Sequence, residues 1–266
     1  MKKKQRTLRI GVLMMGLLVI LAILAPVICR FDPYAQDLYH ALQLPGDGHL
    51  LGTDQLGRDV FSRLLYAART DLLVMVGAEI LPVVLGTSVG MAAGYFGGKV
   101  DGLIALISDT LIAFPYYLLV IVIAFVTGAG IHGIFVTFMI VGWLVYARVA
   151  RALAAALKSS GWVESAKLMG YSDGRILLHE LLPNVLPQIV VVWMTDMAAL
   201  LTAIVTLGYL GIGISAPTPD WGTMISEGQT LIYTAPQLSL LPGLMVVYTG
   251  IALSLIGDGL ADLWRT

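Results

Sequence analysis

The chain has 266 residues, of which 58% are hydrophobic and 12% are charged, and its formal net charge is −1. A mean hydropathy of +0.86 is too high for a soluble domain of this size and indicates a membrane protein. Because the chain has no surplus of Lys and Arg, we expect no nucleic-acid partner. The single cysteine, Cys29, excludes a disulfide framework and a cysteine-based metal cluster.

The first apolar run covers residues 10–29 and follows a basic start, Lys2–Arg9. Its length of about 20 residues is enough to cross a hydrocarbon core of ~30 Å. No small-x-small cleavage sequence follows it. We therefore expect an uncleaved first span whose basic end lies in the cytoplasm.

Residues 30–70 form a polar segment that includes Leu51–Asp59, with the sequence LGTDQLGRD. Val60–Tyr66 then carries apolar residues at helical spacing, which predicts a short helix lying along the membrane interface. Residues 1–70 are thus expected to hold the first span, an external segment and this interfacial helix. Residues 71–266 would form a second unit.

Five further apolar runs are long enough to span a bilayer. They lie at about 72–96, 103–126, 131–148, 184–214 and 238–257. The chain is therefore predicted to be an all-α polytopic membrane protein with six transmembrane helices. The second span carries Gly86, Gly90 and Gly94, a ridge of small residues that favours close packing against another helix.

Positive charges predict the orientation of the spans. With the N-terminus inside, the four Lys and Arg residues of the outer segments are Arg30, Arg58, Arg63 and Arg69. The twelve of the inner segments are Lys2, Lys3, Lys4, Arg6, Arg9, Lys99, Arg148, Arg151, Lys158, Lys167, Arg175 and Arg265. Both termini and the polar insert 150–183 are therefore expected in the cytoplasm.

Three acidic residues lie inside expected spans, namely Glu79, Asp109 and Asp196. An ionisable side chain at a helix centre costs about 2.5–3.5 kcal/mol on insertion scales, so each calls for a reason. They are candidates for a pore or gate role. The alternative is that they bond to neighbouring groups or to a partner subunit and hold helices in place. Glu79 would lie only about two turns from the outer end of its span.

The polar insert is predicted to hold two short helices. The first is Gly161–Met169, and Gly170 stands where a glycine in the left-handed conformation would end it. Ser172 and Asp173 can cap the second helix. Pro183 is expected to close that second helix before the fifth span begins.

Apolar side chains at the end of the first helix suit a partner's groove. Leu168 and Met169 would enter such a groove, and the small Ala166 would allow close approach. The alternative for this insert is an ordinary cytoplasmic loop.

The spacing within the insert resembles the "EAA" signature of ABC-importer permeases. It has Glu-x-Ala, then glycine six residues after the Glu, then Leu-Pro twelve and thirteen residues after the glycine. The matching residues are Glu164, Ala166, Gly170, Leu182 and Pro183, with Ser165 in place of the usual alanine.

The resemblance extends over nearly the whole chain. Stretches that look like the peptide/opine/nickel permease family are Leu51–Asp59, Gly94–Gly98 with Asp101, Asp109 with Phe114–Pro115, Pro217–Gly222 and Gly257–Gly259. Within that family they match the subunit type with one extra N-terminal span.

This resemblance implies a type I ABC-importer permease fold in residues 71–266, with the EAA loop at about 160–183. The loop would form coupling helices that sit in a groove of a cytoplasmic ATPase subunit. The coupling residues so implied are Glu164, Ser165, Ala166, Leu168, Met169, Gly170, Leu182 and Pro183.

The resemblance also implies partners and a location. A second homologous permease, two ABC ATPase subunits and a periplasmic or lipid-anchored substrate-binding protein would complete the transporter in the lipid bilayer of the bacterial inner membrane. The chain would be one half of the pore. It would not be an enzyme and would bind no cofactor or metal, since ATP and Mg would be used by the partner subunits.

Two other classes of protein fit the sequence less well. A self-contained secondary transporter or channel would show an inverted internal repeat, and none is visible in the sequence. A membrane-embedded enzyme would cluster His, Asp or Glu residues, whereas the four histidines lie on separate segments. Small peptides and nickel or other metal chelates remain open as cargo, since His40 and His49 on the outer side are weak evidence for a metal.

The predicted topology can be tested with alkaline phosphatase fusions, since this reporter is active only outside the cytoplasm. A fusion after Lys158 should be inactive, and a fusion after Asp47 should be active. The reverse pattern would overturn the six-span arrangement.

Overall fold

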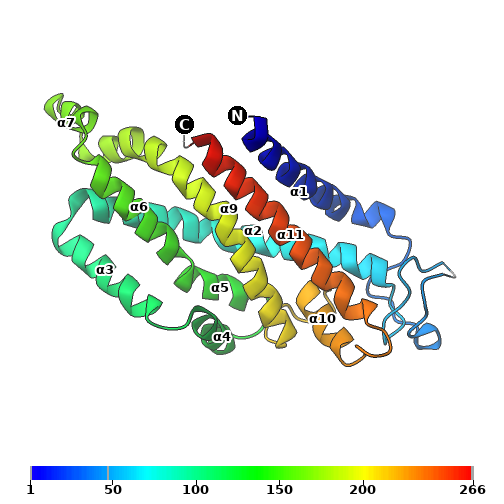
Figure 1. Ribbon diagram of the computed structural model, residues 1–266. Helices are drawn as coiled ribbons and strands as arrows, with labels where there is room; N and C mark the ends of the chain where they lie inside the picture. Colours follow the sequence, from blue (N-terminus) through cyan, green and yellow to red (C-terminus); the bar gives the residue numbers. More distant parts are fainter. Residues whose placement is uncertain (1, 47, 265–266) are drawn as a thin grey trace.

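The computed structural model describes residues 2–46 and 48–264 of the chain. Asp47 and Arg265, which entered the topology prediction, lie outside the described residues. The described elements are helical (Figure 1). They are α1 Lys2–Ile28, α2 Val60–Phe96, α3 Gly98–Ile112, α4 Tyr116–Thr127, α5 Ile131–Val141, α6 Trp143–Leu157, α7 Gly161–Leu168, α8 Asp173–Arg175, α9 Leu182–Tyr209, α10 Trp221–Gln229 and α11 Gln237–Trp264, with a 3-10 turn at Leu38–His40 and a π-helix at Ile176–Leu181.

Five continuous helical stretches are long and apolar enough to cross a membrane, and a sixth crossing requires α3 and α4 together. This pair is bent by 91°. The prediction that a single helix covers residues 103–126 is therefore wrong. Pro115 explains the bend, because a proline disfavours helical geometry at the residue before it, here Phe114, and removes a backbone donor.

Helix α2 begins earlier than expected. Asp59 caps it, with its side chain accepting a hydrogen bond from the Ser62 N–H at 2.7 Å. Val60–Tyr66 is thus the start of α2. The prediction of a separate interfacial helix at these residues is wrong. The buried Asp71 does not interrupt the helix, because its carboxylate accepts the Trp221 N–H at 2.9 Å. Glu79 consequently lies near the middle of this 37-residue helix instead of near its outer end.

The prediction that the second helix of the insert ends at Pro183 is wrong. Instead α8, the π-helix and α9 form one continuous stretch, Asp173–Tyr209. The Leu182 N–H donates to the Leu177 carbonyl, five residues back, and Pro183 occupies the first turn of α9. This change in hydrogen-bond pattern just before the proline lets the helix continue through it.

The glycine ridge of α2 packs against the backbone of α6, as the sequence predicted. A Cβ placed on any of the three glycines would lie 2.2 Å from a carbonyl oxygen of α6. The pairs are Gly86 with Trp143, Gly90 with Ala147 and Gly94 with Arg151. Each pair is one helical turn from the next, so the two helices run in close contact over about two turns.

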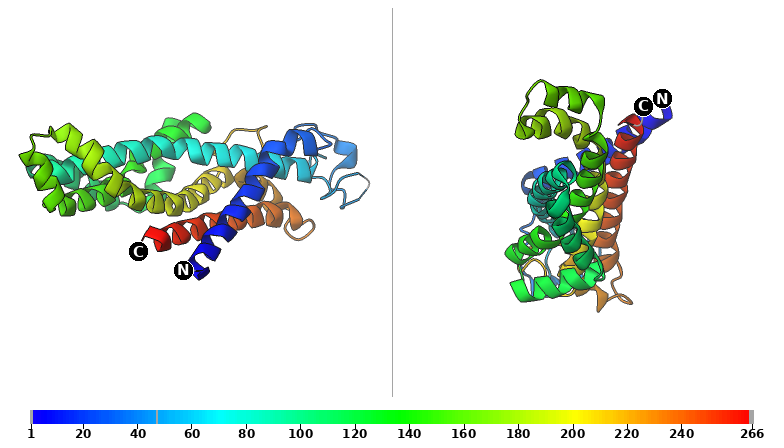
Figure 2. Two further views of the ribbon diagram at one scale, coloured as in Figure 1. Left: turned by 90° about the horizontal axis from the view of Figure 1, so that it is seen from above. Right: turned by 90° about the vertical axis from the view of Figure 1, so that its left-hand side faces the viewer.

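Helices α1 and α11 lie side by side (Figure 1). The Tyr248 hydroxyl donates to the Met14 carbonyl at 2.9 Å, and Leu18 of α1 is fully buried. Figures 1 and 2 show the start of α1 and the end of α11 together in the half of the molecule that carries α7, whereas residues 30–46 and 48–59 gather at the opposite end. This arrangement agrees with both termini and the insert lying on the same side of the membrane.

The contact between α2 and α6 can be tested at Gly90. A Gly90→Val side chain would collide with the Ala147 backbone, which cannot move aside as a flexible side chain could. Overpacking of this kind costs about 1–3 kcal/mol or more, so the Tm of the purified protein in detergent should fall by several degrees. Gly243→Val in α11 is the control, because nothing lies within 4 Å of its Cβ position. Equal Tm values for the two variants would contradict the close contact.

Candidate functional site

Helix α7 ends in the way the sequence predicted. The Tyr171 N–H donates to the Ala166 carbonyl at 3.1 Å, and the Gly170 N–H donates to the Lys167 carbonyl at 3.0 Å. Gly170 itself has φ +80°, in the left-handed region. These two bonds form the Schellman motif that closes a helix at glycine. Ser172 caps the next helix by accepting the Arg175 N–H at 3.4 Å.

The two faces of α7 have different roles. Val163 and Ala166 are buried, in one apolar cluster with Ile176 and Leu181 of the following π-helix. Ala166 therefore allows close approach to its own chain. Leu168 and Met169 lie on the other side, 90% and 65% exposed. An apolar tip on a helix fixed from behind is a surface suited to a partner's groove.

The remaining predicted coupling residues are mostly on the surface. Glu164, Ser165, Gly170 and Pro183 are exposed, whereas Leu182 is half-buried. The Ser165 hydroxyl donates to the Gly161 carbonyl at 2.8 Å within α7. Serine at this position thus keeps the helix intact.

A tyrosine that no sequence pattern marks as functional connects the insert to the transmembrane helices. The Tyr95 hydroxyl, near the inner end of α2, donates to Asp173 Oδ1 at 2.7 Å. The Lys167 ammonium group lies 4.9 Å from the centroid of the Tyr95 ring. Tyr95 thus contacts both short helices of the insert and ties their position to α2.

In the membrane interior, the structure brings together two of the three predicted acidic residues. The Tyr146 hydroxyl of α6 donates to Glu79 Oε1 at 2.5 Å and lies 3.1 Å from Asp196 Oδ2. Glu79 and Tyr146 are fully buried. Three helices, α2, α6 and α9, therefore meet at one hydroxyl group. For Tyr146 the sequence offers one weak signal, a phenol within an apolar run.

Asp109 lies apart from this pair, on α3. Its carboxylate is 3.8 Å from an Arg148 guanidinium nitrogen, and both side chains are more than half exposed. Eight residues earlier on the same helix, Asp101 receives two hydrogen bonds from Arg151. These two polar contacts link α3 to α6.

A cavity of about 580 Å³ lies beneath the bend between α3 and α4. Apolar side chains of the bend and of α6 form most of its wall. Asp196 and Arg148 contribute the charged groups, and Tyr116 contributes an aromatic ring. Asp196 thus connects the buried Glu79–Tyr146 pair to an open space.

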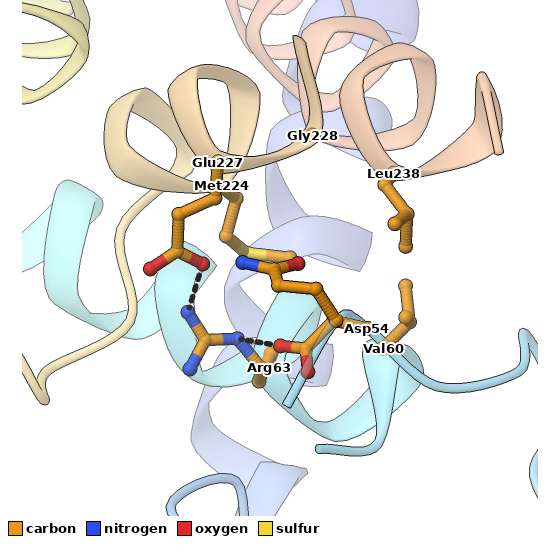
Figure 3. Close-up of a pocket in the computed structure, with 8 residues that line it drawn as sticks. Asp54, Val60, Arg63, Met224, Glu227, Gly228 and Leu238 are labelled. Atoms are coloured by element: carbon orange, nitrogen blue, oxygen red, sulfur yellow. Dashed lines mark hydrogen bonds and ion pairs between the residues drawn. The ribbon is translucent and has the colours of Figure 1, made fainter. Parts of the chain in front are cut away.

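At the outer end, three buried charged side chains and the partly exposed Glu227 fasten residues 51–63 to α10 (Figure 3). Arg58 donates to Asp54 Oδ2 at 2.6 Å and to Glu227 Oε2 at 2.7 Å. Arg63 lies between the same two carboxylates, at 3.4 and 3.3 Å. The nearby Asp220 caps α10, and burial raises the pKa of its carboxyl group.

The two outer histidines bind different carboxylates. His40 contacts Asp37 at 2.6 Å, and this hydrogen bond lowers the pKa of Asp37. His49 contacts Asp59 at 2.9 Å and stacks on Phe31. Within residues 2–46 and 48–264, no group of three His, Cys, Asp or Glu side chains is placed to hold a metal ion.

The role of Tyr146 can be measured as stability. Tyr146→Phe would leave Glu79 and Asp196 facing each other without the shared hydroxyl group. Losing a partner of a buried charged group costs about 1–3 kcal/mol, so the Tm of the purified protein should fall. Tyr233→Phe, at a residue 98% exposed, should leave the Tm unchanged. An unaltered Tm in Tyr146→Phe would show that the hydroxyl contact is not structural.

Comparison with known proteins places this arrangement in a family. The family model described as "Binding-protein-dependent transport system inner membrane component" matches residues 86–264. The dipeptide transport system permease protein of Alkalihalophilus pseudofirmus is 34% identical over 98% of this chain and 86% of its own length. The nickel transport system permease protein of Escherichia coli K12 is 32% identical over 96% of this chain and 92% of its own length.

A solved structure supports the fold. A chain of the methionine ABC transporter MetNI, in an inward-facing conformation, superposes with a TM-score of 0.56 at 17% identity, covering 74% of this chain and 96% of that chain. The family model and the two permeases extend over most of the sequence, including the EAA loop. The chain therefore belongs to the family of binding-protein-dependent transport system inner membrane components and is a multi-pass permease subunit of an ABC importer in the bacterial inner membrane.

Proposed function

We propose that this chain forms one half of the translocation pore for small peptides or for nickel and other metal chelates. In this proposal the EAA loop, residues 160–183, receives the movement of a cytoplasmic ATPase. The observation that carries the proposal is helix α7, whose Leu168 and Met169 are exposed while Val163 and Ala166 fix it to its own chain. A helix held on one face and apolar on the other can transmit a push without bending away.

The contacts behind α7 supply a route into the membrane. Ile176 and Leu181 of the π-helix pack against α7 and lead without a break into α9. Tyr95 binds Asp173 and so links the same loop to α2. Movement of α7 would therefore reach α2 and α9, the two helices that carry Glu79 and Asp196. Those two acids, with Asp109 on α3, are our candidates for pore or gate residues.

Permeases of this family work with ATPase and substrate-binding partners. We propose two ATPase subunits, a second homologous permease and a periplasmic or lipid-anchored binding protein. ATP and Mg would be bound by the ATPases, and this chain would catalyse no reaction and bind no cofactor. Residues 71–266 would form the permease domain, to which residues 1–70 add one span and the external segment.

Both cargo classes have support from relatives, because a dipeptide permease and a nickel permease match this chain with similar sequence identity. The structure places no metal-binding group of three side chains among the described residues. A metal cargo would therefore have to pass this chain without a dedicated set of ligands.

The coupling role can be tested at Gly170. A β-branched residue cannot adopt φ +80° without strain, so Gly170→Val should open the turn and displace α7. Uptake of cargo into cells should be abolished, while the protein stays in the membrane at its normal level. Gly174→Val is the matched control, because Gly174 lies four residues away in a helix with open space around it. Normal uptake and normal co-purification of the ATPase with Gly170→Val would refute the coupling role.

A further inference from the structure

The cavity beneath the α3–α4 bend has the features of a small-molecule site. Its volume of about 580 Å³ falls within the range of roughly 300–1,000 Å³ typical of ligand pockets. Its wall is mostly apolar, with Leu111 and Phe114 near the bend and Leu144 and Val145 on α6. Two charged side chains of opposite sign line it, Asp196 from α9 and Arg148 from α6.

The acidic group in the cavity wall, Asp196, lacks a compensating cation. Asp196 and Glu79 share the Tyr146 hydroxyl, and no ion pair to Lys, Arg or His is formed by either carboxylate in the part of the chain that the structure describes. Glu79 and Asp196 also hydrogen-bond each other, which requires a shared proton, so one negative charge is left without a positive partner in an apolar interior. Because Asp196 lines the cavity, a cationic group of a bound ligand could supply that partner.

The basic group in the cavity wall, Arg148, is only weakly paired. The pair between Arg148 and Asp109 is 3.8 Å long and solvent-exposed, with 56% and 76% of the side chains accessible. Pairs of this kind contribute little, at most about 1 kcal/mol. By contrast, Arg151 holds Asp101 with two hydrogen bonds. The Arg148 guanidinium group can therefore turn toward a ligand carboxylate, which it would bind with two parallel bonds.

We infer that this cavity binds a short peptide in its zwitterionic form, with the ammonium group at Asp196 and the carboxylate at Arg148. The inference rests on the proposed function and selects peptide over metal as the cargo that this chain contacts. A zwitterionic peptide matches both charged side chains, whereas a bare divalent cation would be bound by Asp196 alone and would leave Arg148 without a ligand group. The apolar wall would accept the peptide side chains without requiring a particular one.

The test uses the complete transporter in lipid nanodiscs, without nucleotide or binding protein. Equilibrium binding of radiolabelled alanyl-alanine is measured, with N-acetyl-alanyl-alanine and alanyl-alanine amide as competitors. On the unmodified transporter, each blocked peptide should compete at least tenfold more weakly than the free dipeptide. Asp196→Asn should erase the difference for the acetylated peptide, and Arg148→Gln should erase it for the amide.

Two further variants distinguish a loss of peptide recognition from a loss of folding. Asp196→Glu should restore most of the discrimination, and Asp258→Asn, at an exposed position on α11, should bind as the unmodified protein does. Each variant is checked for ATP hydrolysis stimulated by the binding protein, which shows that the complex has assembled. Arg148 is exposed, so its replacement is compatible with folding.

Failure of this inference differs from failure of the proposed function. If the dipeptide does not bind, or if the blocked peptides compete equally, the inference is overturned even when uptake with the binding protein continues. Absence of any ATP-dependent uptake by the complete transporter would instead count against the proposed function.

Discussion

The close contact between the backbones of α2 and α6 determines much of the structure around it. Gly86, Gly90 and Gly94 let the two helices approach so closely that a Cβ on α2 would collide with the carbonyl groups of α6. At that distance the Tyr146 hydroxyl reaches Glu79 on the neighbouring helix. In lipid, where apolar burial gives little drive for helix association, such close packing is a principal source of stability.

Polar groups in this chain occur at three depths, and each set has a different task. At the outer end, Arg58 joins Asp54 to Glu227 and holds the external segment on α10. In the interior, Tyr146 joins the acidic groups of α2 and α9. At the inner end, Tyr95 holds the EAA loop. Because α2 contributes to all three sets, with Arg63 in the outer one, it can carry a displacement along its whole length.

The sequence was most informative where a single residue type determines local geometry. Gly170 predicted the end of α7, and the three glycines predicted a close helix contact, because few other residues can serve there. Proline was ambiguous: Pro115 bends its span, whereas Pro183 is accommodated after a π-helix. Side-chain pairings such as Tyr146 with Glu79 connect helices distant in sequence. No local pattern specifies them, so they required the structure.

The central claim is that α7 presents its apolar tip to an ATPase. The most direct measurement places a photo-cross-linking amino acid at Leu168, which is 90% exposed, in the assembled transporter. Its matched control is the same amino acid at Tyr233, which is 98% exposed in the segment between α10 and α11. The account predicts a cross-link to the ATPase from position 168 and none from position 233. A cross-link from neither position, or from position 233 alone, would contradict it.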